Sequence, residues 1–396
     1  MNKTAQYIYL LIITIGSLSS CSVSAQTKQD YDVAAFYWPA YHYDQRIAHL
    51  FPDKKGEWEI IYNAVPKEKG HAQPKIPFWG YEDESNPAVM SKKIDAAITH
   101  GVNTFIFDWY WYEGKPFLEE TLNDGFLKAN HERMNFYIMW ANHDATSYWD
   151  VNNPKKDEIY WEGEVDRKQF DIIVDRIINS YFKNPSYYKI DGKPVFCIYE
   201  LKTFIDGLGG AEQAKEALDY FREETKKAGF PGLHLQAILW AALPESIEGL
   251  PGDKVETQNE VLDFFGFNSM TNYCWAHLKN PEGDYEAWGN GATAMWDSFD
   301  KDFSIPYFPN VTVGWDANPR FQTRTSYINN STPDKFAKYM QKAKSYVDSH
   351  PQQHKLITVN AWNEWSEGSY LEPDTANGMG YLEAVKNIIL GDGGVN

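Results

Sequence analysis

Short apolar segments recur along the chain and are separated by longer stretches of mixed polarity. Each segment is nearly continuous in apolar residues, and this is typical of parallel strands that are buried on both faces. The predicted strands are residues 33–38, 104–109, 136–140, 195–199, 233–239, 264–268, 311–315 and 356–361.

The stretches between these segments repeat apolar residues at the spacing of an amphipathic helix. The predicted helices are residues 89–99, 117–129, 167–181, 210–227 and, behind a Ser331-Thr332 cap, 333–347. Strands that alternate with helices form right-handed βαβ units around a parallel sheet. Eight units favour an α/β fold closed into a (β/α)8 TIM barrel, although the sixth unit shows no clear helix pattern.

We expect residues 31–396 to form a single catalytic domain with extended βα loops, because barrels often exceed 250 residues and no linker or internal repeat divides the chain. The longest predicted loop is an insertion at residues 40–86, after the first strand.

The N-terminus has the pattern of a secretory signal: Lys3 is followed by an apolar stretch at residues 7–15. That stretch is shorter than the roughly 20 residues that a membrane-spanning helix needs. The sequence Leu-Ser-Ser-Cys ending at Cys21 resembles a bacterial lipobox. It predicts a lipoprotein signal peptide at residues 1–20, lipidation of Cys21 and a short tether at residues 21–30.

Cleavage after Ala25 is the alternative, and it would discard Cys21 with the signal peptide. Both alternatives predict export. We expect a monomeric lipoprotein in the periplasm or outer membrane of a Gram-negative bacterium, with the lipid anchor at Cys21 as its membrane contact.

Composition narrows the possible partners. The formal net charge of −18, without a basic run, disfavours nucleic acid as a ligand. Cys197 and Cys274 lie in apolar segments, so we expect buried hydrophobic roles and no disulfide framework. No ligand spacing such as His-Glu-x-x-His predicts a metal site, and we expect no cofactor.

Aromatic residues make up 16% of the chain, and many lie beside polar residues, as in the run at residues 107–113. Aromatic walls with a few polar groups suit a sugar ring, so we expect an oligo- or polysaccharide substrate. The active site of a TIM barrel lies at the C-terminal ends of its strands. The candidate substrate-binding residues, for which packing is the alternative role, are Tyr37, His71, Asp108, Trp109, Asn142, His143, Tyr273, Trp315 and Asn363.

Glu364 and Glu367 follow the last predicted strand and are the candidate catalytic residues. Glycosidic bond cleavage needs one group to protonate the leaving oxygen and another to help form the new bond at the anomeric carbon. In a helical turn, side chains at this spacing lie about 5–6 Å apart on one face, whereas on a strand they would point to opposite faces. Gly368 permits such a turn, so we predict that the strand ends near Asn363.

The segments at residues 358–368 (TVNAWNEWSEG) and 370–374 (YLEPD) resemble the family 99 glycoside hydrolases, which are endo-acting α-mannan enzymes. The chain is more similar still to the related WbsX-like proteins, which are often labelled glycosyltransferases. That resemblance also covers residues 70–77 (GHAQPKIP), 107–111 (FDWYW) and 114–115, and it extends over most of the mature chain.

The resemblance to family 99 implies retaining hydrolysis without a covalent enzyme intermediate. By that resemblance Glu364 is the base that deprotonates the sugar's 2-hydroxyl, which attacks the anomeric carbon to give a 1,2-anhydro sugar. Glu367 is then the general acid and, for water, the general base. The mechanism requires a 2-hydroxyl trans to the leaving group, which α-mannosides, α-rhamnosides, β-glucosides and β-galactosides all provide.

Two alternatives remain at this level. In many barrel glycosidases the acids follow strands four and seven, and those positions hold Glu200 and Asp316. The alternative functions are a glycosyltransferase, as some relatives are labelled, and a non-catalytic glycan-binding lipoprotein, which would keep the aromatic rim. The predicted export disfavours the former, because nucleotide sugars are cytoplasmic, and the spacing of Glu364 and Glu367 disfavours the latter.

Overall fold

The computed structural model describes residues 29–248 and 255–391. The predicted signal peptide at residues 1–20 and Cys21 lie outside the described residues. Eight parallel strands form one sheet in the order β10-β9-β8-β4-β2-β1-β14-β12. They are β1 (Asp32–Tyr37), β2 (Thr104–Tyr112), β4 (Asn135–Trp140), β8 (Lys193–Ile198), β9 (His234–Ile238), β10 (Ser269–Thr271), β12 (Asn310–Thr312) and β14 (Leu356–Asn360).

Residues 306–308, which lead into β12, bring the two ends of this sheet together. Met270 on β10 donates its backbone N–H to the carbonyl of Pro306 at 2.9 Å, and Phe308 donates to the carbonyl of Met270 at 2.8 Å. Inside, the hydroxyls of Thr271 and Thr358 meet at 2.8 Å. The predicted (β/α)8 barrel is therefore confirmed.

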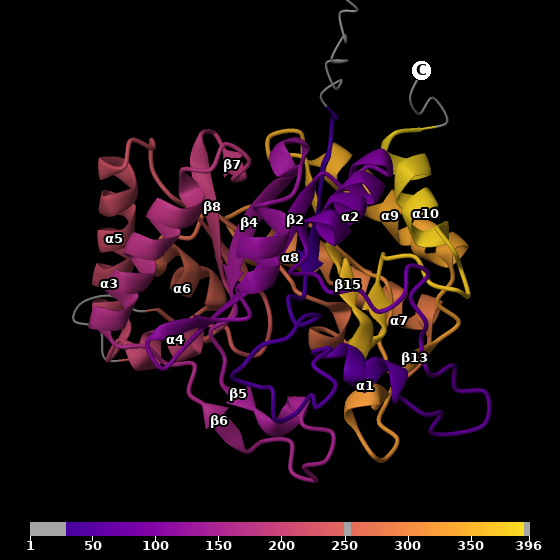
Figure 1. Ribbon diagram of the computed structural model, residues 1–396. Coiled ribbons are helices and arrows are strands. Elements are labelled where there is room, and N and C mark those ends of the chain that lie inside the picture. Colours follow the sequence, from indigo (N-terminus) through magenta and orange to yellow (C-terminus); the bar gives the residue numbers. More distant parts are fainter. Residues whose placement is uncertain (1–28, 249–254, 392–396) are drawn as a thin grey trace, which may run out of the picture.

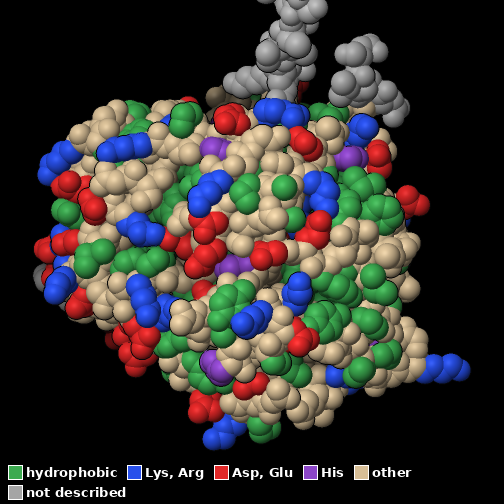
Figure 2. All heavy atoms as spheres, viewed as in Figure 1, with side chains coloured by type: hydrophobic (Ala, Val, Ile, Leu, Met, Phe, Trp, Pro, Cys, Tyr) green, Lys and Arg blue, Asp and Glu red, His purple; other side chains and the backbone are tan. Residues whose placement is uncertain are grey.

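Helices cover the outside of the barrel, with α3 and α5 on one side of Figure 1 and α9 and α10 on the other. The helices are α1 (Trp58–Tyr62), α2 (Pro87–Thr99), α3 (Arg167–Arg176), α4 (Leu201–Gly207), α5 (Ala211–Lys227), α6 (Gln258–Phe265), α7 (Tyr285–Thr293), α8 (Trp296–Asp302), α9 (Pro333–Ser349) and α10 (Gly380–Ile389). Acidic and basic side chains are interspersed over the face in Figure 2. Among the described residues, no helix is both long and apolar enough to cross a membrane.

The C-terminal ends of the strands lie toward the bottom of Figure 1, where α1 and short strand pairs form the extended βα loops. These pairs are β5 (Ala145–Thr146) with β6 (Ile159–Trp161), β11 (Gly283–Asp284) with β13 (Ile328–Asn329), and β15 (Asn363–Glu364) with β16 (Ser369–Tyr370). Two further short strands, β3 (Lys115–Phe117) and β7 (Lys189–Ile190), pair antiparallel with β2 and β8.

The predicted sixth strand, at residues 264–268, is wrong. Phe264 and Phe265 close helix α6, which begins with a capping box at Thr257 and ends at Gly266 in the left-handed conformation, with φ of 68°. The short strand β10 begins only at Ser269. The apolar run had been assigned to a strand because a short buried helix has the same apolar content.

The helix predicted at residues 117–129 is also shorter than expected. Strand β2 continues to Tyr112 and turns back into β3 through Glu113 and Gly114, both with positive φ. Two residues of this kind form the tight turn that suits a β-hairpin. Only Thr121–Phe126 is helical, as a π-helical turn. Cys197 and Cys274 are free and buried, in agreement with the predicted hydrophobic roles.

Candidate active site

A cavity of about 480 Å³ opens at the C-terminal ends of the strands, and Glu364 and Glu367 both line it. Its aromatic walls are Trp38, Tyr110, Tyr148, Trp149, Tyr199, Trp240 and Tyr273. Its carboxyl groups are those of Asp108, Asp144, Glu200, Glu364 and Glu367. Aromatic walls with a few converging polar groups are the usual composition of a small-molecule or sugar site.

The two candidate acids lie on one tight turn, as predicted. Glu364 ends the short strand β15, residues Trp365–Glu367 form a 3-10 turn, and Gly368 follows with φ of 65°. A Cβ at Gly368 would lie 2.8 Å from Cβ of Asp316, so the turn needs glycine for space as well as for conformation. The side chain of Glu364 is 3% exposed and that of Glu367 is 12% exposed, so Glu364 lies deeper.

Tyr273 links Glu364 to a third acid. Its hydroxyl lies 2.6 Å from Oε1 of Glu364 and 2.9 Å from Oδ2 of Asp108. The remaining oxygens, Oε2 of Glu364 and Oδ1 of Asp108, are buried without a hydrogen-bond partner among the described residues. Burial raises the pKa of Asp108 well above its usual range. A neutral Asp108 can donate its proton to the Tyr273 oxygen, which leaves the tyrosine proton for Glu364.

Arg320 provides a buried positive charge beside the two acids. Its guanidinium is 3.4 Å from Glu367 and 3.9 Å from Glu364, and it forms a 2.8 Å ion pair with Glu57. It also donates to the hydroxyl of Ser366 at 2.6 Å. The guanidinium is thereby held against the catalytic turn from both sides.

Burial dominates the protonation of the pair. It raises the pKa of Glu364 well above its usual range, the charge of Glu367 adds to the rise, and Arg320 opposes it. Burial also raises the pKa of Glu367, and Arg320 again opposes the rise. Two buried carboxyls on one turn do not both ionise easily, and the larger rise at Glu364 means that Glu367 ionises first. One acid and one base are therefore present together.

His143 and Glu200 line the opposite side of the cavity. The Nδ1 atom of His143 is 2.8 Å from the carbonyl of Asp144, and burial lowers the pKa of the imidazole. Glu200 accepts a 2.5 Å hydrogen bond from Thr203. A neutral imidazole and a solvent-accessible carboxylate can both bind sugar hydroxyls.

The predicted residues Asn142 and Asn363 are not part of the cavity lining. The Asn142 amide bonds the backbone N–H and carbonyl of Glu200 at 2.8 and 2.7 Å. The Asn363 amide does the same to Trp38, at 2.8 Å for both bonds. Each asparagine fixes the backbone of a neighbouring strand end, so its role is to hold a lining residue in place.

Tyr37 and Trp109 also lie outside the cavity, because side chains on a strand alternate between faces. Tyr37 points outward to Met90 on α2, and Trp109 donates from Nε1 to Glu119 at 2.7 Å. Their neighbours Trp38 and Asp108 face the cavity instead. Asp108 was among the predicted residues and lines the cavity, whereas at the end of β1 the lining residue is Trp38 and not the predicted Tyr37.

His71 and Trp315 line a second cavity of about 720 Å³ on the other side of the catalytic turn. There Nε2 of His71 and the side chain of Gln73 both contact Oδ2 of Asp316, at 2.8 and 2.6 Å. Asp316 also accepts from the backbone and the side chain of Asn318. It is saturated with hydrogen bonds and does not face Glu364, so the geometry disfavours it as the catalytic partner.

Sequence reasoning missed Arg320 and Glu57, whose charges shift the pKa values of both acids. Neither residue comes directly after a predicted strand, and neither belongs to a sequence motif with Glu364. The missed aromatic residues Tyr148, Trp149 and Trp240 come from loops. The local aromatic density was the available signal, but it does not tell which rings face the cavity.

Comparisons with known proteins agree with this fold. A family model described as "Glycosyltransferase WbsX" matches residues 33–385. The uncharacterized protein WxcX of Xanthomonas campestris pv. campestris is 23% identical over 390 residues, which cover 95% of this chain and 52% of that protein. The chain thus spans about half the length of the curated relatives that it matches.

Two solved structures have the same barrel. The GH99 endo-alpha-mannosidase from Bacteroides thetaiotaomicron has a TM-score of 0.54 at 15% identity, over 90% of this chain and 96% of that chain. A glycoside hydrolase-like protein has a TM-score of 0.56 at 15% identity, over 92% and 95%. At this identity the likeness concerns the fold. Because the family model spans most of the sequence, the chain belongs to the family described as glycosyltransferase WbsX.

Proposed function

We propose that the protein is a retaining glycoside hydrolase in which Glu364 and Glu367 act as a base and an acid on one sugar ring. The observation that carries this proposal is their shared turn in a cavity lined with aromatic residues, where burial and mutual repulsion keep the two acids from both ionising easily. The barrel shared with an endo-alpha-mannosidase supports it.

In the first step, ionised Glu364 removes the proton of the sugar's 2-hydroxyl, and that oxygen attacks the anomeric carbon. The bond to the leaving oxygen breaks as Glu367 protonates it, which gives a 1,2-anhydro sugar. In the second step, Glu367 removes a proton from water, the water oxygen attacks the anomeric carbon, and Glu364 returns its proton to the 2-oxygen. Two inversions give net retention.

These roles place the charge on Glu364 and the proton on Glu367, the reverse of the order of the two pKa values in the free cavity, so contacts that stabilise an ionised Glu364 are required. The Asp108–Tyr273 chain donates a hydrogen bond to Glu364 and so stabilises its ionised form. Glu367 is the more exposed acid, so water can reach it for the second step. The positive charge of Arg320 lowers the pKa of both acids and so favours their ionised forms.

The charge of the cavity also limits the substrate. Five carboxyl groups line it, against the single guanidinium of Arg320, which is already paired with Glu57. We therefore expect neutral glycans to be cleaved in preference to uronic acid-containing or sulfated ones, because like charges repel across a low-dielectric cavity.

Wild-type protein and the variants E364Q, E367Q and E200Q, incubated with a panel of neutral and anionic polysaccharides, test the proposal. We expect wild type to release product with retained anomeric configuration by NMR, and both E364Q and E367Q to be nearly inactive. If E200Q is inactive while E364Q and E367Q keep near-full activity, the general acid is Glu200, which follows β8, and the proposed assignment is wrong.

Glycosyl transfer is the second candidate, and the family description favours it. The same 1,2-anhydro intermediate would give transfer if a sugar hydroxyl replaced water. Adding acceptor sugars to the hydrolysis assay separates the two: a transferase forms a larger saccharide in place of free sugar. A non-catalytic glycan-binding protein would bind the panel and release nothing.

We further propose that the chain is an exported lipoprotein anchored through Cys21. The pattern of residues 1–21 supports this proposal. Mass spectrometry of the mature N-terminus tests it, because a diacylglyceryl-modified Cys21 differs in mass from a chain cleaved after Ala25.

A further inference from the structure

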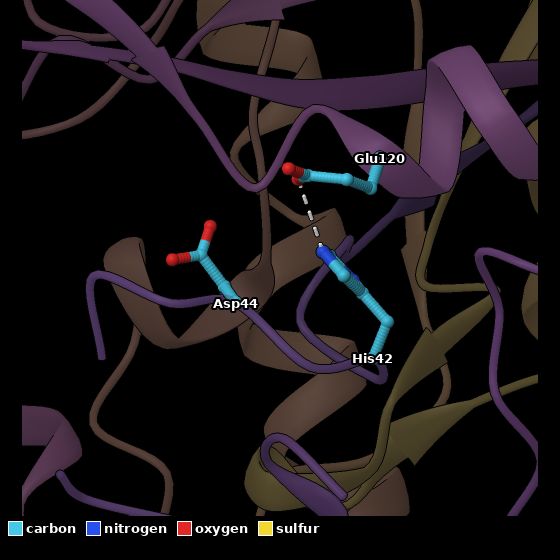
Figure 3. Close-up of side chains that lie close together, drawn as sticks. All are labelled: His42, Asp44 and Glu120. Atoms are coloured by element: carbon cyan, nitrogen blue, oxygen red, sulfur yellow. Dashed lines mark hydrogen bonds and ion pairs between the residues drawn. The ribbon is translucent and has the colours of Figure 1, made fainter. Parts of the chain in front are cut away.

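Three potential metal ligands meet outside the active-site cavity, between the loop after β1 and the segment after β3. They are His42, Asp44 and Glu120, and their ligand atoms all lie within 4.8 Å of one another. Figure 3 shows the three side chains around one space, with Glu120 and His42 in contact. His42 is 2% exposed and Asp44 is 8% exposed, whereas Glu120 is half-exposed and leaves an entry path.

The hydrogen bonds of Thr121 determine which nitrogen of His42 carries the proton. The Thr121 hydroxyl donates its single proton to the carbonyl of Pro39 at 2.9 Å. It therefore accepts at its 3.1 Å contact with His42, whose Nδ1 must be the donor. In the neutral imidazole this leaves a lone pair on Nε2. Metal-binding histidines are commonly oriented by such a hydrogen bond from the ring nitrogen that does not bind the metal.

That lone pair faces an oxygen of Glu120 at 3.2 Å. Two acceptors at this distance repel unless a proton or a cation lies between them. Asp44 adds a second carboxylate to the same space. Arg46 does not neutralise the cluster through its guanidinium, which is directed to Glu113.

The spacing between His42 and Glu120 suits a metal ion. Two ligands each about 2.1 Å from a cation lie 3.2 Å apart when the angle between them is near 100°, between octahedral and tetrahedral values. Imidazole together with carboxylates suits zinc or manganese better than calcium or magnesium. We propose that His42, Asp44 and Glu120 bind a first-row divalent cation, with Zn²⁺ the best match.

A cation here would be structural. The loop after β1 carries Trp38 and Glu57, which touch Arg320 at the active site. The loop is packed tightly at this point, since a Cβ at Gly56 would lie 2.2 Å from the carbonyl of His42. The ion would join this loop to the segment that carries Glu120, and so hold Trp38 and Glu57 in place.

Calorimetric titration of the untagged, EDTA-treated protein with ZnCl2 tests the site, with metal content measured by mass spectrometry after dialysis. We expect a single Zn²⁺ per chain, and a loss of affinity of at least about ten-fold in H42Q and in E120Q. E120Q tests the site even if H42Q fails to fold, because Glu120 is half-exposed. The matched control is D124N, which removes an exposed acid from the same π-helical turn and should bind as wild type does.

Hydrogen exchange adds a readout that does not depend on activity. Zinc should slow exchange in residues 38–58 of the wild type and leave it unchanged in E120Q. Absence of binding at millimolar zinc, or equal binding by wild type and E120Q, would overturn the proposal and leave an imidazolium–carboxylate ion pair in its place.

Discussion

Two clusters of buried carboxyl groups lie on opposite sides of the last barrel strands, and they differ in how completely they are paired. In the outer cluster, Lys93 on α2 pairs with both Glu84 and Glu372. Glu84 also accepts from Asn363, and Glu372 accepts from the indole nitrogens of Trp362 and Trp365 at 2.9 and 2.8 Å. These acids have partners on both oxygens.

The inner cluster, around Glu364, is paired incompletely. One oxygen of Glu364 and one of Asp108 are buried without a hydrogen-bond partner in the described part of the chain, and both residues line the cavity. An unpaired buried carboxyl oxygen is costly unless a ligand fills the space. The outer cluster is thus paired as a structural support of the turn, and the inner cluster has the unpaired oxygens that our proposed chemistry requires.

The largest expected effect is the loss of activity in E367Q, a substitution in the inner cluster. E367Q keeps the shape of the side chain but removes the transferable proton, so we expect activity to fall by about 10³-fold. The melting temperature should stay within a few degrees of wild type, since no buried charge is left unpaired. Assays of glycan cleavage with calorimetric melting curves check both; a large fall in melting temperature would place Glu367 with the structural cluster.

Breaking the outer cluster should act on stability instead. K93M leaves Glu84 and Glu372 buried without their cation, and this type of change costs about 3–5 kcal/mol of unfolding free energy. Urea unfolding measures it. K92M is the control on the same helix: its pair with Glu82 is partly exposed and should contribute about 0–1 kcal/mol. Equal effects of the two substitutions would contradict the assignment.

Y273F sharpens the comparison from inside the cavity. It removes a hydrogen bond to a charged group, a loss of about 1.5–3 kcal/mol, so we expect kcat/KM to fall roughly ten- to hundred-fold. Ionised Glu364 loses its donor, so its pKa rises and the acidic limb of the pH–rate profile should move to higher pH. An unchanged limb with an equal loss at every pH would instead indicate a packing role for Tyr273.

The smallest expected effect is the pH dependence of stability from Glu84. Burial raises its pKa from 4.5 to about 7, so the folded state binds more protons than the unfolded state between these values. The contribution of Glu84 is fully present below pH 4.5 and is lost as pH rises through about 7. E84Q should therefore flatten the decline in unfolding free energy between pH 5 and 7.5, by an amount on the order of 1–3 kcal/mol. An unaltered slope in chemical denaturation would show that Lys93 keeps Glu84 ionised throughout.

The two tryptophans beside Glu364 support the turn and do not line the cavity. Trp362 and Trp365 interleave with Glu364 and Glu367 along the chain, a pattern that a solvated loop would not select. In the structure both indoles bind Glu372 and lie away from the cavity. They support the catalytic turn from behind, and aromatic residues of other loops face the substrate space.

The sequence by itself determined the barrel and the turn that carries Glu364 and Glu367, because both depend on local patterns. Continuous apolar runs predict buried strands, and the i, i+3 spacing of Glu364 and Glu367 before Gly368 predicts a turn. The exception was the sixth unit, where a short buried helix and a buried strand have the same apolar content.

Only the tertiary structure decided what surrounds that turn. Arg320, Glu57 and Tyr273 reach it from three separate loops, and Tyr37 and Trp109 face away from it because strand side chains alternate. The protonation of Glu364 depends on burial and on charges distant in sequence. Such forces act through space, so no local pattern in the chain records them.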